Sequence, residues 1–214
     1  DIYRNRTFAH FNKNPFCGSL ENEDFWNTHC PILFDSLDDN TIRLALDKYR
    51  IDMGLCPLIE TWNVSMVTDM SGLFEDFSDF NGNITNWNTR NVNSMNSMFV
   101  GATSFNQPLK WNTDNVTDMS FMFKEAENFN QPLEHIEGHW NTTNVMDMSS
   151  MFYGATSFNQ PLNWNTENVT NMRSMFYGAI SFNEHLNFTN TSNVEDMSYM
   201  FHGATIFNQS LNWD

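Results

Sequence analysis

Basic residues are scarce in this sequence. It contains only 10 lysines and arginines against 26 aspartates and glutamates, which gives a formal net charge of −16 at pH 7. Because no cluster of lysine and arginine offsets this charge locally, the chain would repel a phosphate backbone. The composition therefore argues against a nucleic-acid partner, although it does not select another ligand.

Cysteine is rarer still. The three cysteines, Cys17, Cys30 and Cys56, all lie near the start of the chain, and their spacing matches no zinc-binding pattern. An odd number prevents complete pairing within the chain. One disulfide in this region is expected if the protein is secreted, and buried free thiols are the alternative.

Long apolar runs and catalytic motifs are also missing. No run of about 18 apolar residues occurs, so we expect no transmembrane span in this segment. No Gly-x-Ser-x-Gly motif, phosphate-binding loop or metal triad occurs either, so we expect neither an enzyme nor a cofactor. The sequence starts at Asp1 without methionine and ends just inside a repeat, and we expect it to be part of a longer chain, for instance after removal of a signal peptide.

The chain does contain a repeat, which occupies residues 62–214. The spacing between copies is 24 or 25 residues, except for 29 residues in the third copy. A period of this size predicts a solenoid, because one repeat cannot bury its apolar face without stacking on its neighbours. Six copies begin at an aromatic residue, and a seventh copy opens before the end: Trp62, Trp87, Trp111, Trp140, Trp164, Phe188 and Trp213.

Apolar residues recur at fixed places in each copy and predict the core. Phenylalanine at two places and methionine at two more supply most of the expected core volume, with methionine filling gaps between the rings. In the fifth copy these residues are Val169, Met172, Met175, Phe176, Ala179, Phe182 and Leu186.

Two spacings within a copy predict two local structures. Leu162 and Trp164 are two residues apart, which predicts a short strand, whereas Val169, Met172 and Phe176 follow helical or 3-10 offsets. We expect parallel strands at Leu-x-Trp to stack about 4.8 Å apart, with helical or 3-10 turns over Met-x-x-Met-Phe. An asparagine follows the second core phenylalanine in every copy, and we expect these side chains to satisfy backbone groups in a ladder: Asn81, Asn106, Asn130, Asn159, Asn183 and Asn208.

The pattern Val-x-x-Met-x-x-Met-Phe-x-Gly-Ala-x-x-Phe-Asn, preceded by Trp-Asn, resembles a known repeat family. This family was first noted in mycoplasma surface lipoproteins as a domain of unknown function and is related to BspA-like leucine-rich repeats. The resemblance covers Trp62 to Asp214. It implies a leucine-rich-repeat-like solenoid on a surface-exposed or secreted protein, used for adhesion or protein interaction, without catalytic residues. The first copy departs from the pattern at Met66 and Phe77, as expected of a terminal repeat.

Residues 1–61 lack the repeat and are predicted to form an N-terminal arm and a helical cap. Asp38 or Asp39 can begin a helix, and Gly54 and Pro57 lie beyond its end. A helix across the first repeat would cover an apolar end and its unpaired strand edge. The residues expected on the buried face of this helix are Ile42, Ala45, Leu46 and Tyr49.

The arm before the helix is the candidate interaction segment. It is rich in aromatic residues and has no repeat neighbours to cover them, and exposed apolar clusters often mark interaction sites. We expect deletion of residues 1–36 to weaken partner binding while the repeats stay folded. The aromatic residues are Phe8, Phe11, Phe16, Phe25 and Trp26.

Two acidic constellations resemble metal sites. A column of aspartates, interrupted by Ser94 and Asn171, offers oxygen ligands that suit Ca²⁺, but solvated positions at the start of a turn explain it better. The sequence from Glu134 to His139 contains two histidines and two glutamates, but their order is not His-Glu-x-x-His, and an exposed loop is the preferred interpretation. We therefore expect no metal. The aspartates of the column are Asp69, Asp118, Asp147 and Asp196.

Nine Asn-x-Ser/Thr sequons occur, many of them expected by chance in a sequence rich in asparagine, serine and threonine. Asn208 belongs to the ladder, where a glycan would disrupt packing. Four others depart from the repeat consensus and are the candidate glycosylation sites if the chain enters a secretory pathway: Asn5, Asn83, Asn187 and Asn190.

Two functions follow from these observations. The first is a non-enzymatic surface or secreted module that binds a protein or a glycan, as solenoids commonly do. The second is a structural subunit of a large assembly, such as a virus particle or a cell-surface layer. Polar, variable positions on the strand face would favour recognition, whereas an ordered arm and a covered end would favour assembly.

Overall fold

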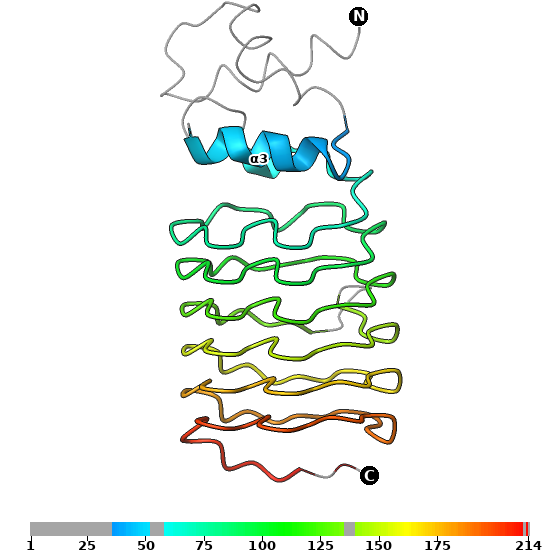
Figure 1. Cartoon of the computed structure of the whole chain (residues 1–214), viewed down its shortest axis with the longest axis vertical. Coiled ribbons are helices and arrows are strands. Elements are labelled where there is room, and N and C mark those ends of the chain that lie inside the picture. Colours follow the sequence, from blue (N-terminus) through cyan, green and yellow to red (C-terminus); the bar gives the residue numbers. More distant parts are fainter. Residues whose placement is uncertain (1–35, 52–57, 135–139, 212, 214) are drawn as a thin grey trace, which may run out of the picture.

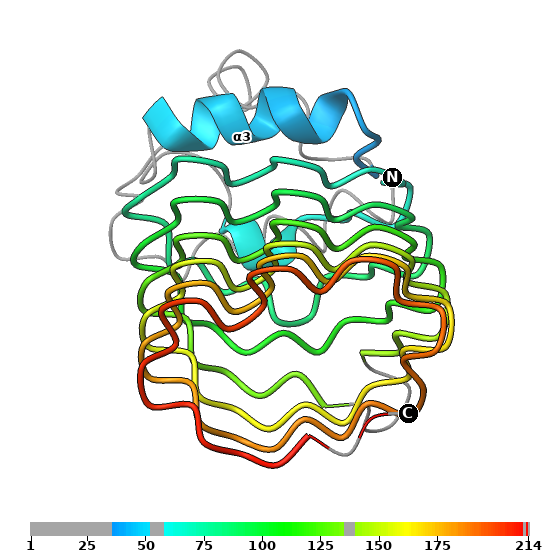
Figure 2. The same cartoon turned by 60° about the horizontal axis from the view of Figure 1, so that its bottom comes forward.

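The computed structural model describes residues 36–51, 58–134, 140–211 and 213. Helix α3 (Thr41–Ile51) lies across one end, followed by the short 3-10 helix η1 (Ile59–Thr61). The chain then winds coil upon coil away from α3 (Figure 1), and the coils follow similar paths in the turned view (Figure 2). We number the coils 1 to 6 by their repeats: 62–86, 87–110, 111–139, 140–163, 164–187 and 188–212.

The parallel contacts between coils are isolated bridges, one residue long. The expected pairing at Leu-x-Trp is confirmed for Leu162, which bridges Leu186. A longer row of parallel bridges runs through the acidic column. It begins with the pair of Asp69 and Ser94 and continues from coil to coil as far as Asp196. This row corrects the interpretation of that column as the start of a helical turn. Its residues join neighbouring coils instead.

The segment after each bridge is a run of β-turns, and the predicted helical or 3-10 turns are wrong. In coil 2 the N–H of Met98 donates to Met95 O at 3.3 Å, but the N–H of Phe99 donates to Met122 O of the next coil at 2.9 Å. Ser97 (φ 58°) and Gly101 (φ 66°) have left-handed backbones, which end any right-handed helix. A β-turn and a helical turn share the i to i+3 spacing, and here hydrogen bonds between coils decide between them.

The predicted core is confirmed. Val169, Met172 and Phe176 are 0% exposed, and their counterparts in coils 2 to 4 are equally buried. Aromatic rings run through the stack in continuous columns, with Phe152 lying 5.5 Å from Phe176 and 4.0 Å from Phe158, centroid to centroid. Each coil therefore covers the apolar face of the coil before it.

Polar ladders hold the coils in register. The expected asparagine ladder is confirmed, since the N–H of Asn159 donates to Asn130 Oδ1 at 2.9 Å and the same bond recurs between the other members of this column. The indole Nε1 of Trp164 donates to Leu133 O at 2.9 Å, and Trp87, Trp111 and Trp140 make the corresponding bond. Buried Thr142 donates its hydroxyl to Asn165 O at 2.8 Å. The asparagine bonds satisfy backbone N–H groups, whereas the tryptophan and threonine bonds satisfy backbone carbonyls.

Helix α3 is the expected cap. Asp38 begins it, because its carboxylate accepts the N–H groups of Asn40 (3.1 Å) and Thr41 (2.8 Å). These bonds, led by the backbone N–H of Thr41, lower the pKa of Asp38. Ile42, Ala45 and Leu46 are buried as predicted, and Tyr49 is half-buried against coil 1.

Candidate interaction surface

The outward side of the bridge row is a polar surface, which we call the bridge face. It consists of the bridge residues Asp69, Ser94, Asp118, Asp147, Asn171 and Asp196, together with the partly exposed Ser71, Asn96 and Ser198. The bridge side chains mostly cap their own turns: Asp118 Oδ1 accepts the N–H of Ser120 at 2.9 Å, and Asp147 Oδ1 accepts that of Ser149 at 2.7 Å. Such bonds explain the carboxylates without a metal ion.

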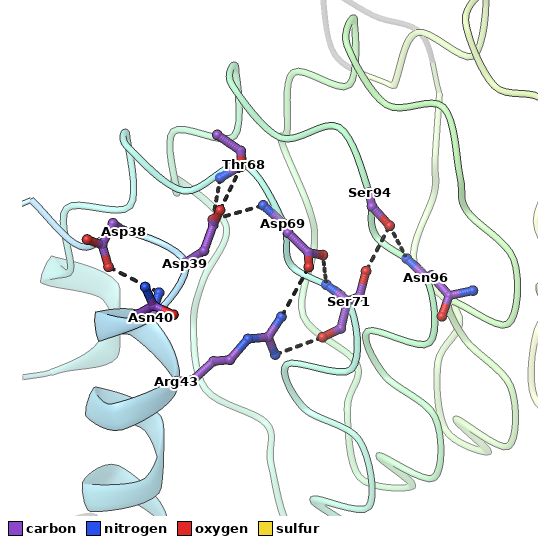
Figure 3. Close-up of polar contacts among 9 residues, drawn as sticks. All are labelled: Asp38, Asp39, Asn40, Arg43, Thr68, Asp69, Ser71, Ser94 and Asn96. Atoms are coloured by element: carbon purple, nitrogen blue, oxygen red, sulfur yellow. Dashed lines mark hydrogen bonds and ion pairs between the residues drawn. The ribbon is translucent and has the colours of Figure 1, made fainter.

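Neighbouring coils also share hydrogen bonds across the bridge face. Figure 3 shows the part nearest α3, where Ser71 Oγ lies 2.8 Å from Ser94 Oγ and Asp69 lies 3.6 Å from the guanidinium of Arg43. At the other end, the hydroxyl and N–H of Ser198, followed by Arg173, lower the pKa of Asp196. This carboxylate is therefore ionised at neutral pH and already has partners.

A second set of outward residues forms an aromatic strip on coils 3 to 6. Tyr153 and Tyr177 stack face to face, with centroids 4.6 Å apart and planes 3° from parallel. The ring of His202 continues the stack 4.7 Å from Tyr177. The strip consists of Lys124, Tyr153, Arg173, Tyr177, Tyr199 and His202.

Two cations lie against the rings of this strip. Lys124 Nζ is 5.3 Å from the centroid of Tyr153, and the Arg173 guanidinium is 5.2 Å from that of Tyr199, within the range of cation–π attraction. Arg173 also donates to Ser198 Oγ at 2.9 Å and lies 3.5 Å from Asp196. Tyr199 remains 56% exposed.

The strip differs in composition from the rest of the repeat surface. It contains every lysine and arginine after Lys110 and every tyrosine after Trp62 in the sequence. Tyrosine and arginine are the residue types that dominate binding hot spots. This surface was not predicted from the sequence, although a signal was present: Lys124, Tyr153, Tyr177 and His202 each directly follow a core phenylalanine.

The repeats match one family model, described as "Mycoplasma protein of unknown function, DUF285", at residues 54–138 and 134–214. The chain belongs to this family. Each of the two matches to DUF285 spans three coils, which agrees with the repeat boundaries. No curated protein and no solved structure matched the chain.

Other features of this DUF285 chain give less support for a site. A surface depression of 440 Å³ is lined by Asn115, Thr117, Asn144, Met146 and Asn168. The amides of its asparagines are already used, since Asn144 Nδ2 donates to Asp114 O at 2.6 Å and Asn168 Nδ2 to Thr143 O at 2.7 Å. The described residues include no group of three or more histidines, cysteines, aspartates or glutamates that could hold a metal ion.

Three of the candidate glycosylation sites are exposed: Asn83, Asn187 and Asn190. The Asn187 amide donates to Asn163 Oδ1, so a glycan there would replace a bond between coils. None of the helices in the described part of the chain has the length and apolar character of a membrane span. Several predicted residues lie outside the described residues: Asn5, Phe8, Phe11, Phe16, Cys17, Phe25, Trp26, Cys30, Cys56, His135 and His139.

Proposed function

We propose that this chain is a non-enzymatic interaction module, a leucine-rich-repeat-like solenoid of the BspA type that binds a protein on its outward face. The observation that carries the proposal is the aromatic strip. Three tyrosines and two cations gather there on a surface rich in asparagine, serine, threonine and acidic residues. The core needs none of these side chains, so their presence is best explained by contact with a partner.

The geometry of the strip favours a protein over a glycan. A sugar ring stacks on the open face of an aromatic ring. The faces of Tyr153 and Tyr177 cover one another at 4.6 Å, and Lys124 lies over the remaining face of Tyr153. Ring edges and hydroxyl groups are left for a partner, and these suit the mixed polar and apolar contacts of a protein interface.

The proposed location is the cell surface or the secreted fraction, in keeping with the resemblance to BspA-like proteins. The second candidate function is a structural subunit of a large assembly, such as a virus particle or a cell-surface layer. It is favoured by the covered end of the stack, where helix α3 lies across coil 1.

Photo-crosslinking tests the protein-binding role of the strip. Benzoylphenylalanine is incorporated at Tyr177, within the strip, or at exposed Met146, away from it, and each protein is irradiated with a cell-surface extract. We expect a protease-sensitive adduct only from position 177. Unlabelled chain should compete for it, and an Arg173→Glu chain should compete at least ten-fold less well. Equal adducts from both positions, or none, would refute the strip, and a periodate-sensitive adduct would favour a glycan.

A further inference from the structure

Each coil has a left-handed backbone at the same two places in its run of turns. The first place lies two residues after the first core methionine: Gly72, Ser97, Phe121, Ser150, Ser174 and Tyr199. The second place lies four residues further on: Asp76, Gly101, Glu125, Gly154, Gly178 and Gly203. The φ angle lies between 53 and 77° at both places in every coil. The fold therefore requires a conformation that glycine adopts most easily.

Coil 3 departs from small residues at both places. Phe121 (φ 59°) stands where coils 2, 4 and 5 have serine, and Glu125 (φ 59°) stands where coils 2, 4, 5 and 6 have glycine. A large side chain on a left-handed backbone is strained. Burial does not offset this strain, because Phe121 is only half-buried and lies outside the hydrophobic core, and the Glu125 side chain is 53% exposed. Two residues that the fold does not favour and the core does not use point to a role outside the stack.

These two residues border the aromatic strip. The N–H of Lys124 donates to Phe121 O at 3.0 Å, and Glu125 follows directly. In coil 6 the residues that correspond to Phe121 and Lys124 are Tyr199 and His202, whose ring centroids lie 6.1 Å apart. The coils follow similar paths (Figure 2), so Phe121 lies beside Lys124, at the end of the strip nearest α3.

Glu125 carries the more accessible charge of its pair with Lys124. Lys124 Nζ lies 3.8 Å from Glu125 Oε1 and 5.3 Å from the ring centroid of Tyr153, so the ammonium group is held between them. The Lys124 side chain is 32% exposed and that of Glu125 is 53% exposed. Because exposed ion pairs are weak, the carboxylate is able to accept a second cation. The net charge of −16 favours a basic partner in the same way.

We propose that Phe121 and Glu125 form the anchor of the interaction surface, and that the partner protein places an apolar side chain against Phe121 and a neighbouring lysine or arginine against Glu125. This inference rests on the proposed function, since it names the chemistry of the partner that the strip binds. Phe121 supplies the apolar contact, and Glu125 supplies the charge that fixes the register of the partner along the stack.

Exchanging residues between coils tests whether the fold disfavours this anchor. Glu125→Gly gives coil 3 the residue of coils 4 and 5. Gly178→Glu makes the reverse change in coil 5, where an added Cβ would come no closer than 3.9 Å to Gly154. The first variant should raise the urea midpoint by about 0.3 M, and the second should lower it by at least as much. A lower midpoint for Glu125→Gly would show that the fold itself uses the glutamate, and would overturn the proposal.

Peptide selection tests the chemistry of the partner. A random library of short peptides displayed on phage is selected on the wild-type chain, and we expect enriched peptides to combine an apolar residue with a neighbouring lysine or arginine. Phe121→Gly and Glu125→Gln should each weaken their binding about ten-fold or more, whereas Glu167→Gln, which removes an exposed carboxylate of coil 5, should not change it. Replacing the basic residue of the peptide by glutamate should abolish binding to wild type, and Glu125→Lys should restore it.

The remaining outcomes separate the anchor from the strip. Failure to enrich peptides, enriched peptides without a basic residue, or full affinity for both Phe121→Gly and Glu125→Gln would each overturn the anchor. If such peptides lose affinity only with Arg173→Glu, the strip still binds protein and the anchor alone is wrong. If no strip variant changes peptide binding and position 177 also gives no photo-adduct, the proposed function falls with the anchor.

Discussion

Replacing Phe152 with alanine measures how tightly the coils are packed. Its ring is 0% exposed, lies between Phe123 at 5.7 Å and Phe176 at 5.5 Å, and stacks on Phe158 of its own coil at 4.0 Å. Truncating a buried phenylalanine generally costs about 3 to 5 kcal/mol. We expect a loss of unfolding free energy in the upper half of this range, because hydrogen bonds between coils on both sides prevent the cavity from collapsing.

The same column supplies a matched control at the end of the stack. Phe201 follows Phe176 at 5.6 Å but is only partly buried, with no further coil beyond it among the described residues. Because part of this ring already contacts water, Phe201→Ala should cost only about 1 to 2 kcal/mol. The difference between the two variants isolates the contribution of the second covering coil.

Urea denaturation, followed by tryptophan fluorescence and by far-UV circular dichroism, measures both losses. Tryptophans open each of coils 1 to 5, so their emission reports on the packing of these rings, whereas circular dichroism reports on the backbone of the whole stack. If the two signals separate, the coils unfold in parts, as nearest-neighbour stability permits. Equal losses for Phe152→Ala and Phe201→Ala, or a loss below about 1 kcal/mol for the first, would refute a continuous close-packed core.

Two further predictions concern polar groups. Asn130→Ala removes the Oδ1 atom that accepts both the N–H of Asn159 and the Gln160 amide, and should lower the unfolding free energy by about 1 to 3 kcal/mol in the same urea assay. The control is Asn86→Ala, which removes an exposed side chain outside the ladder and should change the unfolding free energy by close to zero. Partial burial opposes ionisation of Asp39, but hydrogen bonds led by the Asp69 N–H lower its pKa. The ionised carboxylate therefore stabilises the folded protein above about pH 4, and this contribution is lost as the pH falls through the folded pKa. The urea midpoint of wild type should therefore fall more between pH 5 and pH 3 than that of Asp39→Asn, and parallel curves would contradict this role.

The buried residues could be predicted from the sequence because the repeat supplied six independent copies of one pattern. Val169, Met172 and Phe176 had to face inward, since nothing else explains why the same residue types recur at the same places. The helix that caps coil 1 was predictable for a different reason. Asp38 and the buried face of α3 are local signals that do not depend on the repeats.

The backbone path could not be predicted in the same way. The spacing of Met95 and Met98 is common to a helical turn and to a β-turn, and the left-handed backbone of Ser97 has no signature in a serine side chain. Bonds from one coil to the next select the β-turns. The bridge row was misread for a related reason, because an aspartate that caps a turn and an aspartate that begins a helix look alike in sequence.

The aromatic strip escaped prediction because it arises from variation between the copies rather than from their repetition. The position after the first core phenylalanine changes from Glu75 in coil 1 to Lys124 in coil 3 and Tyr177 in coil 5, while the phenylalanine itself stays the same. Stacking requires only that these side chains tolerate their neighbours at the spacing of the coils, and Tyr153 and Tyr177 do so by stacking face to face. Each such position can therefore change its chemistry without cost to the core, and under the proposed function a partner would be recognised by the order of side chains along the stack.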